Sequence, residues 1–189
     1  MGGTMKIMSY VITHDYGFAP NPYGGMLTLA TCKPVIRNNA KLGDILVATG
    51  STKGAYGNKL IYVGKISEII TMDEYFEDLK FEYKKPKGTS GEGCRGDNIY
   101  YKNNNKWFQL ENRFHDEGNM EHDLKSKNVL ICEEFWYFGN KALEIPDRFL
   151  GIVKNGPGHK NTSSKDMISS FLDWINNYER GRIGRPSSL

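Results

Sequence analysis

Glycine and asparagine are spread along the whole of this 189-residue chain, and they constrain its fold more than any other feature. The 21 glycines are about 11% of the residues, against a typical share of about 7%, and 16 asparagines accompany them. Both residue types tolerate positive φ and tight turns. The sequence therefore argues against a bundle of long helices and favours a turn-rich sheet or barrel.

Short apolar runs between these turns predict a series of strands. The predicted strands cover residues 6–13, 27–31, 45–49, 60–70, 98–101, 107–110, 129–132 and 135–138. Thr71 and Glu74 have capping-box spacing and predict a short helix to about residue 78. Apolar side chains at helical spacing after residues 163–166 predict an amphipathic C-terminal helix. We expect an α+β fold, a small mixed or antiparallel β-barrel with these two helices.

The length and the distribution of charge predict one domain, over residues 5–181. Residues 1–4 are interpreted as an N-terminal extension or tag, and residues 182–189 as a basic, flexible tail. The polar, lysine- and glycine-rich residues 82–97 predict a mobile excursion. The net charge of +3 neither demands nor excludes a nucleic-acid partner.

The compartment is predicted from the cysteines and from the apolar runs. Three scattered cysteines without a CxxC pair favour a reducing environment. The apolar runs are too short to cross a membrane, and the first residues lack the apolar stretch of a secretory signal. We therefore expect a cytoplasmic protein without a membrane partner.

The loop HDYGFAPNP, which follows the first strand, contains the first candidate site. His14 is a candidate general base, and Asp15 is the carboxylate that would orient it. Neighbours on an extended strand point to opposite faces, so the two side chains need not touch. The alternative is a rigid, proline-braced loop whose aromatic side chains cap the barrel.

The turn TCKP provides two cations near a strand end, Lys33 and Arg37, which are candidates to bind phosphate. Cys32 is a candidate nucleophile, but no local feature indicates an activated thiol. Buried cysteines are common, so the sequence favours a buried thiol with solvated cations beside it.

Two glycine loops are candidates to bind an anion. Gly50 and Ser51 follow a predicted strand, but the spacing is not that of a P-loop. The run GPGHK combines two glycines with His159 and Lys160 and leads toward a helix N-terminus, which makes it the better candidate. The alternative for this second loop is an ordinary surface loop.

A group of histidines and carboxylates, mostly in the second half of the chain, is a candidate metal site. The group comprises Asp97, His115, Asp116, His122 and Asp123. Paired histidines and carboxylates can bind a metal. Their spacings fit no short metal-binding motif, so we predict neither a metal site nor a cofactor.

Several of these segments together resemble a known family. The loop HDYGFAPNP, the turn TCKP and the segment FWYFG are similar to the nucleotide modification associated domains, most of all to the second family of that name. The resemblance extends over residues 6–174. The run GPGHK departs from the GRGHR form of the family, because Pro157 stands where the family has an arginine. The runs GDILVATGS and LIYVGKISEI more weakly resemble PUA-like barrels, including ASCH and EVE domains.

The resemblance implies that the chain binds a nucleotide or a modified base, in association with DNA-base modification or phage–host conflict. A PUA-like barrel would bind the base in a pocket, with DNA as a further candidate partner. Aromatic side chains would stack on the base and cations would contact its phosphate. The predicted ligand contacts are Tyr16, Phe18, Asn21, Thr31, Lys33, Arg37, Ser51, Trp136, Phe138, His159 and Lys160.

Two further hypotheses stay open. The first is a hydrolase or transferase that acts on a nucleotide or base. Its general base would be His14 or His159, with Asp15 or Asp97 as partner and Lys33 as electrophilic stabiliser. The second is a non-catalytic phage protein that sequesters a signalling nucleotide.

Overall fold

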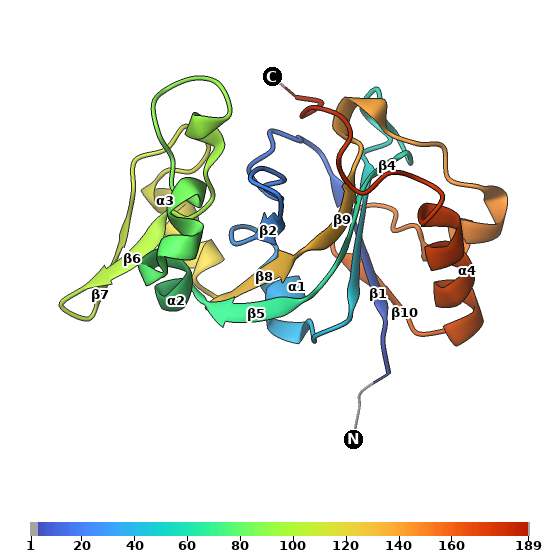
Figure 1. Cartoon of the computed structure of the whole chain (residues 1–189), viewed down its shortest axis with the longest axis horizontal. Coiled ribbons are helices and arrows are strands. Elements are labelled where there is room, and N and C mark those ends of the chain that lie inside the picture. Colours follow the sequence, from blue (N-terminus) through green and yellow to red (C-terminus); the bar gives the residue numbers. More distant parts are fainter. Residues whose placement is uncertain (1–3, 189) are drawn as a thin grey trace.

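A six-stranded sheet organises the molecule, and the computed structural model describes residues 4–188 (Figure 1). The strand order is β10-β1-β3-β4-β9-β11. The β1–β3 and β9–β11 pairs are parallel and the other pairs are antiparallel. The strands are β1 (Ile7–Ile12), β3 (Ile45–Gly50), β4 (Leu60–Lys65), β9 (Glu134–Tyr137), β10 (His159–Thr162) and β11 (Gly181–Arg182).

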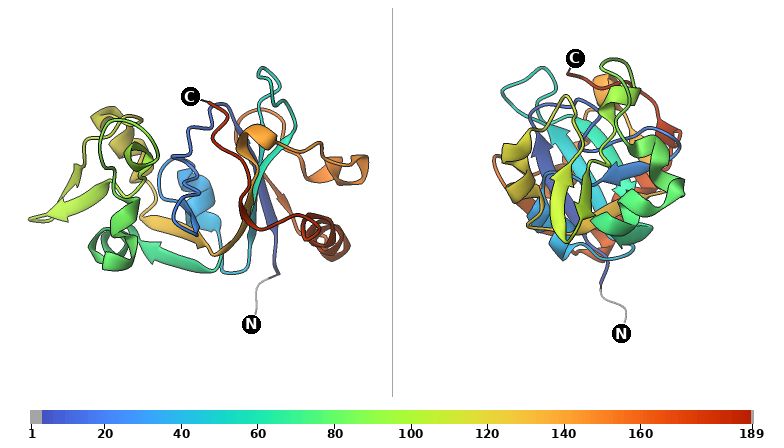
Figure 2. Two further views of the ribbon diagram at one scale, coloured as in Figure 1. Left: turned by 45° about the horizontal axis from the view of Figure 1, so that its top comes forward. Right: turned by 90° about the vertical axis from the view of Figure 1, so that its left-hand side faces the viewer.

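Apolar side chains alternate between the two faces of this sheet, as the period-2 geometry of a strand requires. One set packs with the helix α4 (Lys165–Ile175), which covers one face in Figure 2. The other set packs with a second sheet and with the helix α1 (Pro34–Asn39). Trp136 belongs to the first set and its neighbour Tyr137 to the second.

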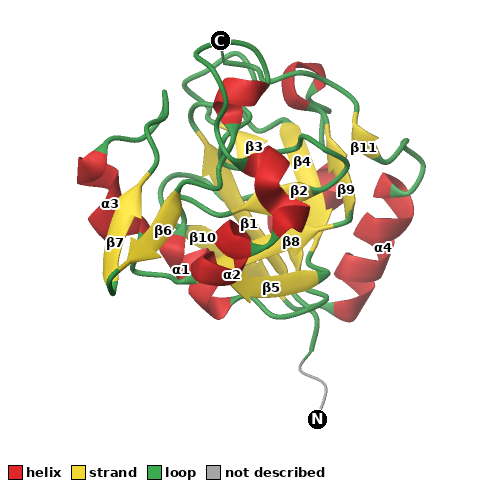
Figure 3. Cartoon of the chain, turned by 60° about the vertical axis from the view of Figure 1, so that its left-hand side comes forward, coloured by secondary structure: helices red, strands yellow, loops and turns green. Residues whose placement is uncertain are grey.

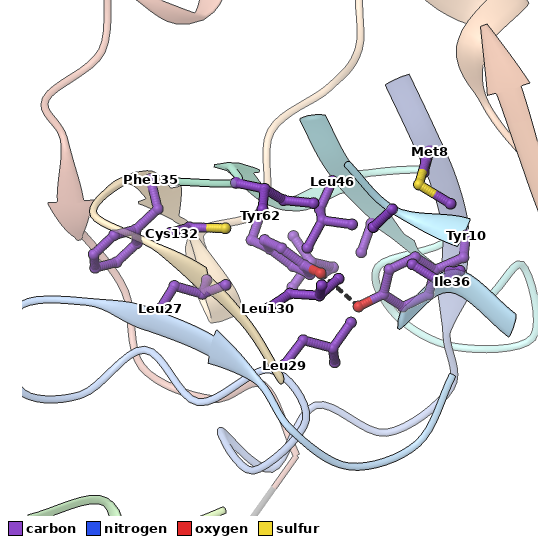
Figure 4. Close-up of a cluster of buried hydrophobic side chains, with 14 of the residues drawn as sticks. Met8, Tyr10, Leu27, Leu29, Ile36, Leu46, Tyr62, Leu130, Cys132 and Phe135 are labelled. Atoms are coloured by element: carbon purple, nitrogen blue, oxygen red, sulfur yellow. Dashed lines mark hydrogen bonds between the residues drawn. The ribbon is translucent and has the colours of Figure 1, made fainter. Parts of the chain in front are cut away.

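The second sheet contains three strands, in the order β2-β8-β5. They are β2 (Leu27–Leu29), β5 (Glu68–Thr71) and β8 (Asn128–Cys132). Figure 4 shows the core between this sheet and the large one, where the hydroxyls of Tyr10 and Tyr62 lie 2.6 Å apart among apolar side chains. An internal hydrogen bond of this kind removes the cost of burying two hydroxyls.

A separate lobe lies beyond the second sheet (Figure 1), and Figure 3 shows the molecule with this lobe turned toward the viewer. It contains the hairpin β6 (Tyr100–Asn103) and β7 (Lys106–Gln109) and the helices α2 (Met72–Glu77) and α3 (Glu117–Asp123). Asn104 and Asn105 turn the hairpin with φ of 48° and 62°, the left-handed conformation that asparagine tolerates. Short 3-10 helices cover residues Leu79–Lys84, Gly93–Arg95, Gly139–Lys141 and Asp147–Ile152.

The α+β class is confirmed, but the predicted PUA-like barrel is not. Within residues 4–188 the strands form three separate sheets, and none of them closes on itself. The predicted strand over residues 60–70 is instead two strands, β4 and β5, in different sheets. The chain changes sheets at Ser67, whose backbone N–H donates to the carbonyl of Ile131 in β8.

The C-terminal residues 182–188 pack against the rest of the chain, where a flexible tail was expected. The backbone N–H of Ile183 donates to the carbonyl of Tyr137, and that of Ser188 donates to the carbonyl of Asp15, both at 2.9 Å. The N–H of Ser187 donates to the Asp15 carboxylate at 3.3 Å. Of the expected extension over residues 1–4, residues 1–3 lie outside the described part of the chain.

None of the helices between residues 4 and 188 has the length and the apolar surface needed to span a membrane.

Candidate functional site

Three loops meet at one edge of the large sheet because of the strand directions. The parallel pairing of β1 with β3 places their carboxyl ends together, with Ile12 opposite Gly50. Strand β10 runs antiparallel to β1, with Tyr10 opposite His159, so the loop before β10 reaches the same edge. The glycine-rich loops after β1, after β3 and before β10 therefore converge.

Two adjoining cavities open at this edge. The first, which we call the histidine cavity, has a volume of about 580 Å³. The second, which we call the lysine cavity, has a volume of about 420 Å³. The cavities share four lining residues: Val11, Thr13, Lys33 and Gly158. They therefore form one continuous depression with two chemically different halves.

The histidine cavity combines an apolar wall with ring nitrogens and a thiol. Its apolar lining includes Tyr10, Ile12, Ala19, Pro34, Val35 and Ile36. His14, His122 and His159 also line it, and so does Cys32. An apolar pocket with a few polar groups is the usual form of a small-molecule site.

The lysine cavity is lined by Lys33, Lys53 and Lys154, together with Ser51 and residues 156–158. No acidic residue lines either cavity in the described part of the chain, so no carboxylate neutralises the lysines there. Burial lowers the pKa of Lys33, and the neighbouring Cys32 acts in the opposite direction. Uncompensated ammonium groups around a cavity favour an anionic ligand.

The turn that carries Cys32 is held in an uncommon conformation. Cys32 and Lys33 have φ of 57° and 42°, in the left-handed region that few non-glycine residues adopt. The backbone N–H of Cys32 donates to the Asp123 carboxylate at 2.8 Å, and its carbonyl accepts from Nε of Arg37 at 2.8 Å. These bonds fix the turn at the wall of the histidine cavity.

Cys32, His115 and Asp123 form a connected group at this wall. Sγ of Cys32 lies 3.5 Å from Nε2 of His115. On the other side of the ring, Nδ1 lies 2.8 Å from Oδ2 of Asp123, an ion-pair distance at an angle outside hydrogen-bond geometry. The hydroxyl of Tyr100 donates to the same oxygen at 2.7 Å. The order of thiol, imidazole and carboxylate is that of cysteine nucleophile sites.

The charged forms of His115 and Asp123 stabilise each other. Burial lowers the pKa of His115, but Asp123 and Cys32 raise it by more, to about 9. Burial raises the pKa of Asp123, while the contacts with His115 and Tyr100 lower it by more, so the net direction is down. At neutral pH an imidazolium therefore stands between a carboxylate and the thiol of Cys32.

Sequence reasoning treated these residues separately and missed the group. The sequence favours a buried thiol at Cys32, and it offers His115 and Asp123 only as candidate metal ligands. The thiol and the ring are 83 residues apart in the chain, and no local pattern connects them. Lys53 and Lys154 were also missed, because isolated lysines in polar loops carry no distinctive signal.

The predicted pair of His14 and Asp15 does not form. His14 lines the histidine cavity and stacks on Tyr16, with ring centroids 5.7 Å apart. Asp15 is buried, and its two carboxylate oxygens lie 2.6 and 2.7 Å from the hydroxyl of Tyr137. The Asp15 carboxylate is thus a structural acceptor that does not orient His14.

Asp97, the other predicted carboxylate partner, lies in a buried network away from both cavities. It accepts hydrogen bonds of 2.7 Å from the hydroxyls of Thr28 and Tyr75. Asn21 belongs to the same region, where its side-chain oxygen accepts from Nζ of Lys84 at 2.8 Å. We leave both residues out of the candidate site because their polar atoms are already engaged.

The predicted phosphate contacts divide into two groups. Lys33 and His159 line the cavities, as does Ser51. Arg37 is fully buried and donates to backbone carbonyls. Lys160 is exposed on β10 and is absent from the residues lining either cavity. The GPGHK run leads into β10, and the helix predicted after residues 163–166 begins at Lys165.

The remaining predicted ligand contacts serve mainly as core. Trp136 and Phe138 are buried against α4, with no face open to a base. Thr31 is fully buried as well. Phe18 packs edge-on to His115, with centroids 4.8 Å apart, and so supports the cavity wall from behind. Tyr16 lines a separate pocket with Arg95, Arg113 and Phe114.

Comparison with known proteins agrees with the resemblance noted from the sequence. A family model described as nucleotide modification associated domain 2 matches residues 4–189. Neither the curated proteins nor the solved structures gave a match.

Proposed function

The chain belongs to the nucleotide modification associated domain 2 family, and from this membership we propose that its two joined cavities bind a nucleotide. The family description links the chain to nucleotide modification. In the proposed complex the base occupies the histidine cavity and the phosphate occupies the lysine cavity. The two cavities share Lys33, which would stand between the base and the phosphate.

The observation that carries this proposal is the separation of chemistry between the two halves of one depression. A nucleotide has at one end a flat base with apolar faces and polar edges, and at the other end an anionic phosphate. The histidine cavity offers an apolar wall with three histidines, and the lysine cavity offers three lysines without a lining carboxylate. Charge-assisted bonds to phosphate are among the stronger hydrogen bonds in proteins.

The glycines before β10 also suit a phosphate. Gly156 and Gly158 have φ of 72° and 86°. At Gly156 an added Cβ would meet nothing within 4 Å, so the backbone there is uncovered on that side. An open backbone lets an anion approach the chain closely. Pro157, between the two glycines, adds no cation, so Lys53 and Lys154 would supply the charge instead.

Removal of Lys53, which is exposed, and Lys154, which is half-buried, is expected to weaken binding of nucleotides but not of nucleosides. We expect the double variant Lys53→Gln/Lys154→Gln to lose at least about tenfold in affinity for a nucleoside 5′-monophosphate, since a hydrogen bond to a charged group contributes about 1.5–3 kcal/mol. Isothermal titration calorimetry with deoxynucleoside monophosphates, deoxyuridine monophosphate and the matching nucleosides measures this loss.

The variant Lys106→Gln is the matched control, because Lys106 is an exposed lysine of the β6–β7 hairpin. We expect it to bind like the natural sequence. The proposed function is wrong if the folded protein binds none of these nucleotides, or if the double variant and the control bind them equally well.

A further inference from the structure

We propose that Cys32 is a catalytic nucleophile that adds to C6 of a pyrimidine base held in the histidine cavity, with His115 as the proton donor. The proposal rests on the proposed nucleotide binding and deepens it, because it assigns a substrate class and a chemical step to the same site.

The position of the thiol is the first argument. Cys32 lines the histidine cavity and is half-buried, whereas Cys94 and Cys132 are buried in the core. Nε2 of His115 lies 3.5 Å from the sulfur. His115 does not itself line the histidine cavity, so in the proposed complex its Nε2 must reach the base beside the sulfur. The thiol thus belongs to a cavity-lining residue and has a donor beside it.

The surroundings of the sulfur are the second argument. His115 is flanked by the Asp123 carboxylate, which accepts the Tyr100 hydroxyl on the same oxygen. Lys33 follows Cys32 in the chain, and the Arg37 guanidinium donates to the Cys32 carbonyl. His115, Lys33 and Arg37 thus lie next to the turn, and the Asp123 carboxylate contacts both the ring and the backbone N–H of Cys32. Nucleophilic cysteines typically lie in partly exposed, electropositive surroundings of this kind.

The proposed step balances with the groups already in the site. The thiolate of Cys32 forms a bond to C6, and the C5=C6 electron pair moves to C5 and the adjacent carbonyl. His115 then gives its Nε2 proton to C5, which leaves a neutral imidazole and a 5,6-dihydropyrimidine joined to the sulfur. The reverse step returns a proton from C5 to His115 and expels the thiolate.

We propose a pyrimidine because thiolate addition to this base requires no further reactant. Addition at C6 needs only a thiolate and a proton, and no oxidant, reductant or leaving group takes part. C5 of the adduct lies beside a carbonyl, so either of its two hydrogens can leave. The addition therefore exchanges the C5 hydrogen of a bound uracil nucleotide with solvent, and it prepares C5 for modification by an electrophile.

The test uses deoxyuridine 5′-monophosphate and the whole chain in deuterium oxide. We expect proton NMR to show loss of the C5 hydrogen signal with the natural sequence. With Cys32→Ser the loss is expected to stop, since a serine hydroxyl does not ionise at neutral pH. With His115→Asn it is expected to slow by about a hundredfold, which is the usual contribution of a positioned proton donor. Circular dichroism verifies that each variant is folded.

A second measurement is independent of catalysis. Iodoacetamide is expected to label Cys32 in preference to Cys94 and Cys132 at pH 7, as read by peptide mass spectrometry. His115→Asn is expected to slow labelling of Cys32 by about tenfold. If His115→Asn does not fold, the comparison of the natural sequence with Cys32→Ser decides.

The outcomes separate this inference from the proposed function. Calorimetric binding of deoxyuridine monophosphate without exchange of its C5 hydrogen overturns the nucleophile and leaves nucleotide binding intact. Binding of purine nucleotides alone has the same consequence. The absence of binding to every nucleotide overturns both.

Discussion

Replacing Arg37 with methionine is expected to destabilise the protein by about 3–5 kcal/mol, because four carbonyls lose their donor and each buried polar group left unsatisfied costs about 1–3 kcal/mol. The Arg37 guanidinium is fully buried. It donates to the carbonyls of Cys32, Ser126, Asn128 and Asp123 at 2.8, 3.1, 2.9 and 2.6 Å. Methionine fills a similar volume but leaves these acceptors without a donor. Urea unfolding followed by tryptophan fluorescence measures the loss.

The matched control is Arg113→Met, because Arg113 is an exposed arginine that lines a shallow pocket. We expect its unfolding free energy to stay within about 0.5 kcal/mol of the natural sequence. The comparison also decides the role of Arg37. Unchanged stability of Arg37→Met together with a loss of phosphate affinity would restore the phosphate contact that the sequence suggested.

The second large effect is expected at Lys84 and Asp97, two buried charges that interact. Nζ of Lys84 donates to the carbonyl and side-chain oxygens of Asn21 at 3.1 and 2.8 Å and to the carbonyl of Met26 at 2.8 Å. Burial lowers the pKa of Lys84, and burial raises the pKa of Asp97, with the charge of each opposing the shift in the other. We expect Lys84→Met to cost about 3 kcal/mol at pH 7.

The sign of the pH dependence follows from Asp97. Without Lys84 the pKa of Asp97 rises further, so the folded variant takes up a proton more readily than the unfolded chain does. Proton uptake favours the fold as pH falls, and we expect the cost of Lys84→Met to be smaller at pH 5 than at pH 7. Urea unfolding at the two pH values measures the difference.

Two further variants complete this comparison. The double variant Lys84→Met/Asp97→Asn is expected to lose less unfolding free energy than the two single variants together. The reason is that Asp97→Asn removes the carboxylate charge that Lys84→Met leaves without a partner. Lys87→Met, at an exposed lysine of the following loop, is the control with little expected effect. Two results together would contradict an interaction between the two charges. One is an equal loss of unfolding free energy for Lys84→Met at pH 5 and pH 7, and the other is a double variant whose loss equals the sum of the two single losses.

Local chemistry was enough to predict many elements of the fold. Thr71 and Glu74 form the expected capping box, with the Thr71 N–H donating to the Glu74 carboxylate at 2.7 Å. The strands on either side of Asn104 and Asn105 and the amphipathic helix α4 were also predicted. In each case the signal lies within a few neighbouring residues, which is the range over which capping, turn chemistry and periodicity act.

Properties that depend on distant contacts were not predictable. Alternation places Trp136 of β9 and Phe138, which follows β9, on the same face, but it does not show whether that face meets α4 or the second sheet. The polar stretch 82–97 was predicted to be mobile, yet it contains the buried residues Lys84 and Asp97. Their hydrogen-bond partners come from β2, from the loop before it and from Tyr75 in α2, which sequence periodicity does not reveal.

The candidate site also depends on contacts between residues far apart in the sequence. The glycine loops were recognised one by one, but their convergence depends on the parallel pairing of β1 with β3. The Cys32–His115 contact depends on how the lobe that contains the β6–β7 hairpin and α3 packs on the turn before α1. Composition identified loops that approach a ligand closely, and only the strand order brings them to one cavity edge.

An NMR titration of ¹⁵N-labelled protein with deoxyuridine monophosphate tests the proposed binding site most directly. We expect the largest amide shifts at Thr13, Cys32, Lys33, Lys53 and Gly158, which line the two cavities, and little change in α4 or in the β6–β7 hairpin. Shifts centred on α4 or on the hairpin, or no shifts at a saturating concentration, would contradict a nucleotide site at the carboxyl ends of β1 and β3.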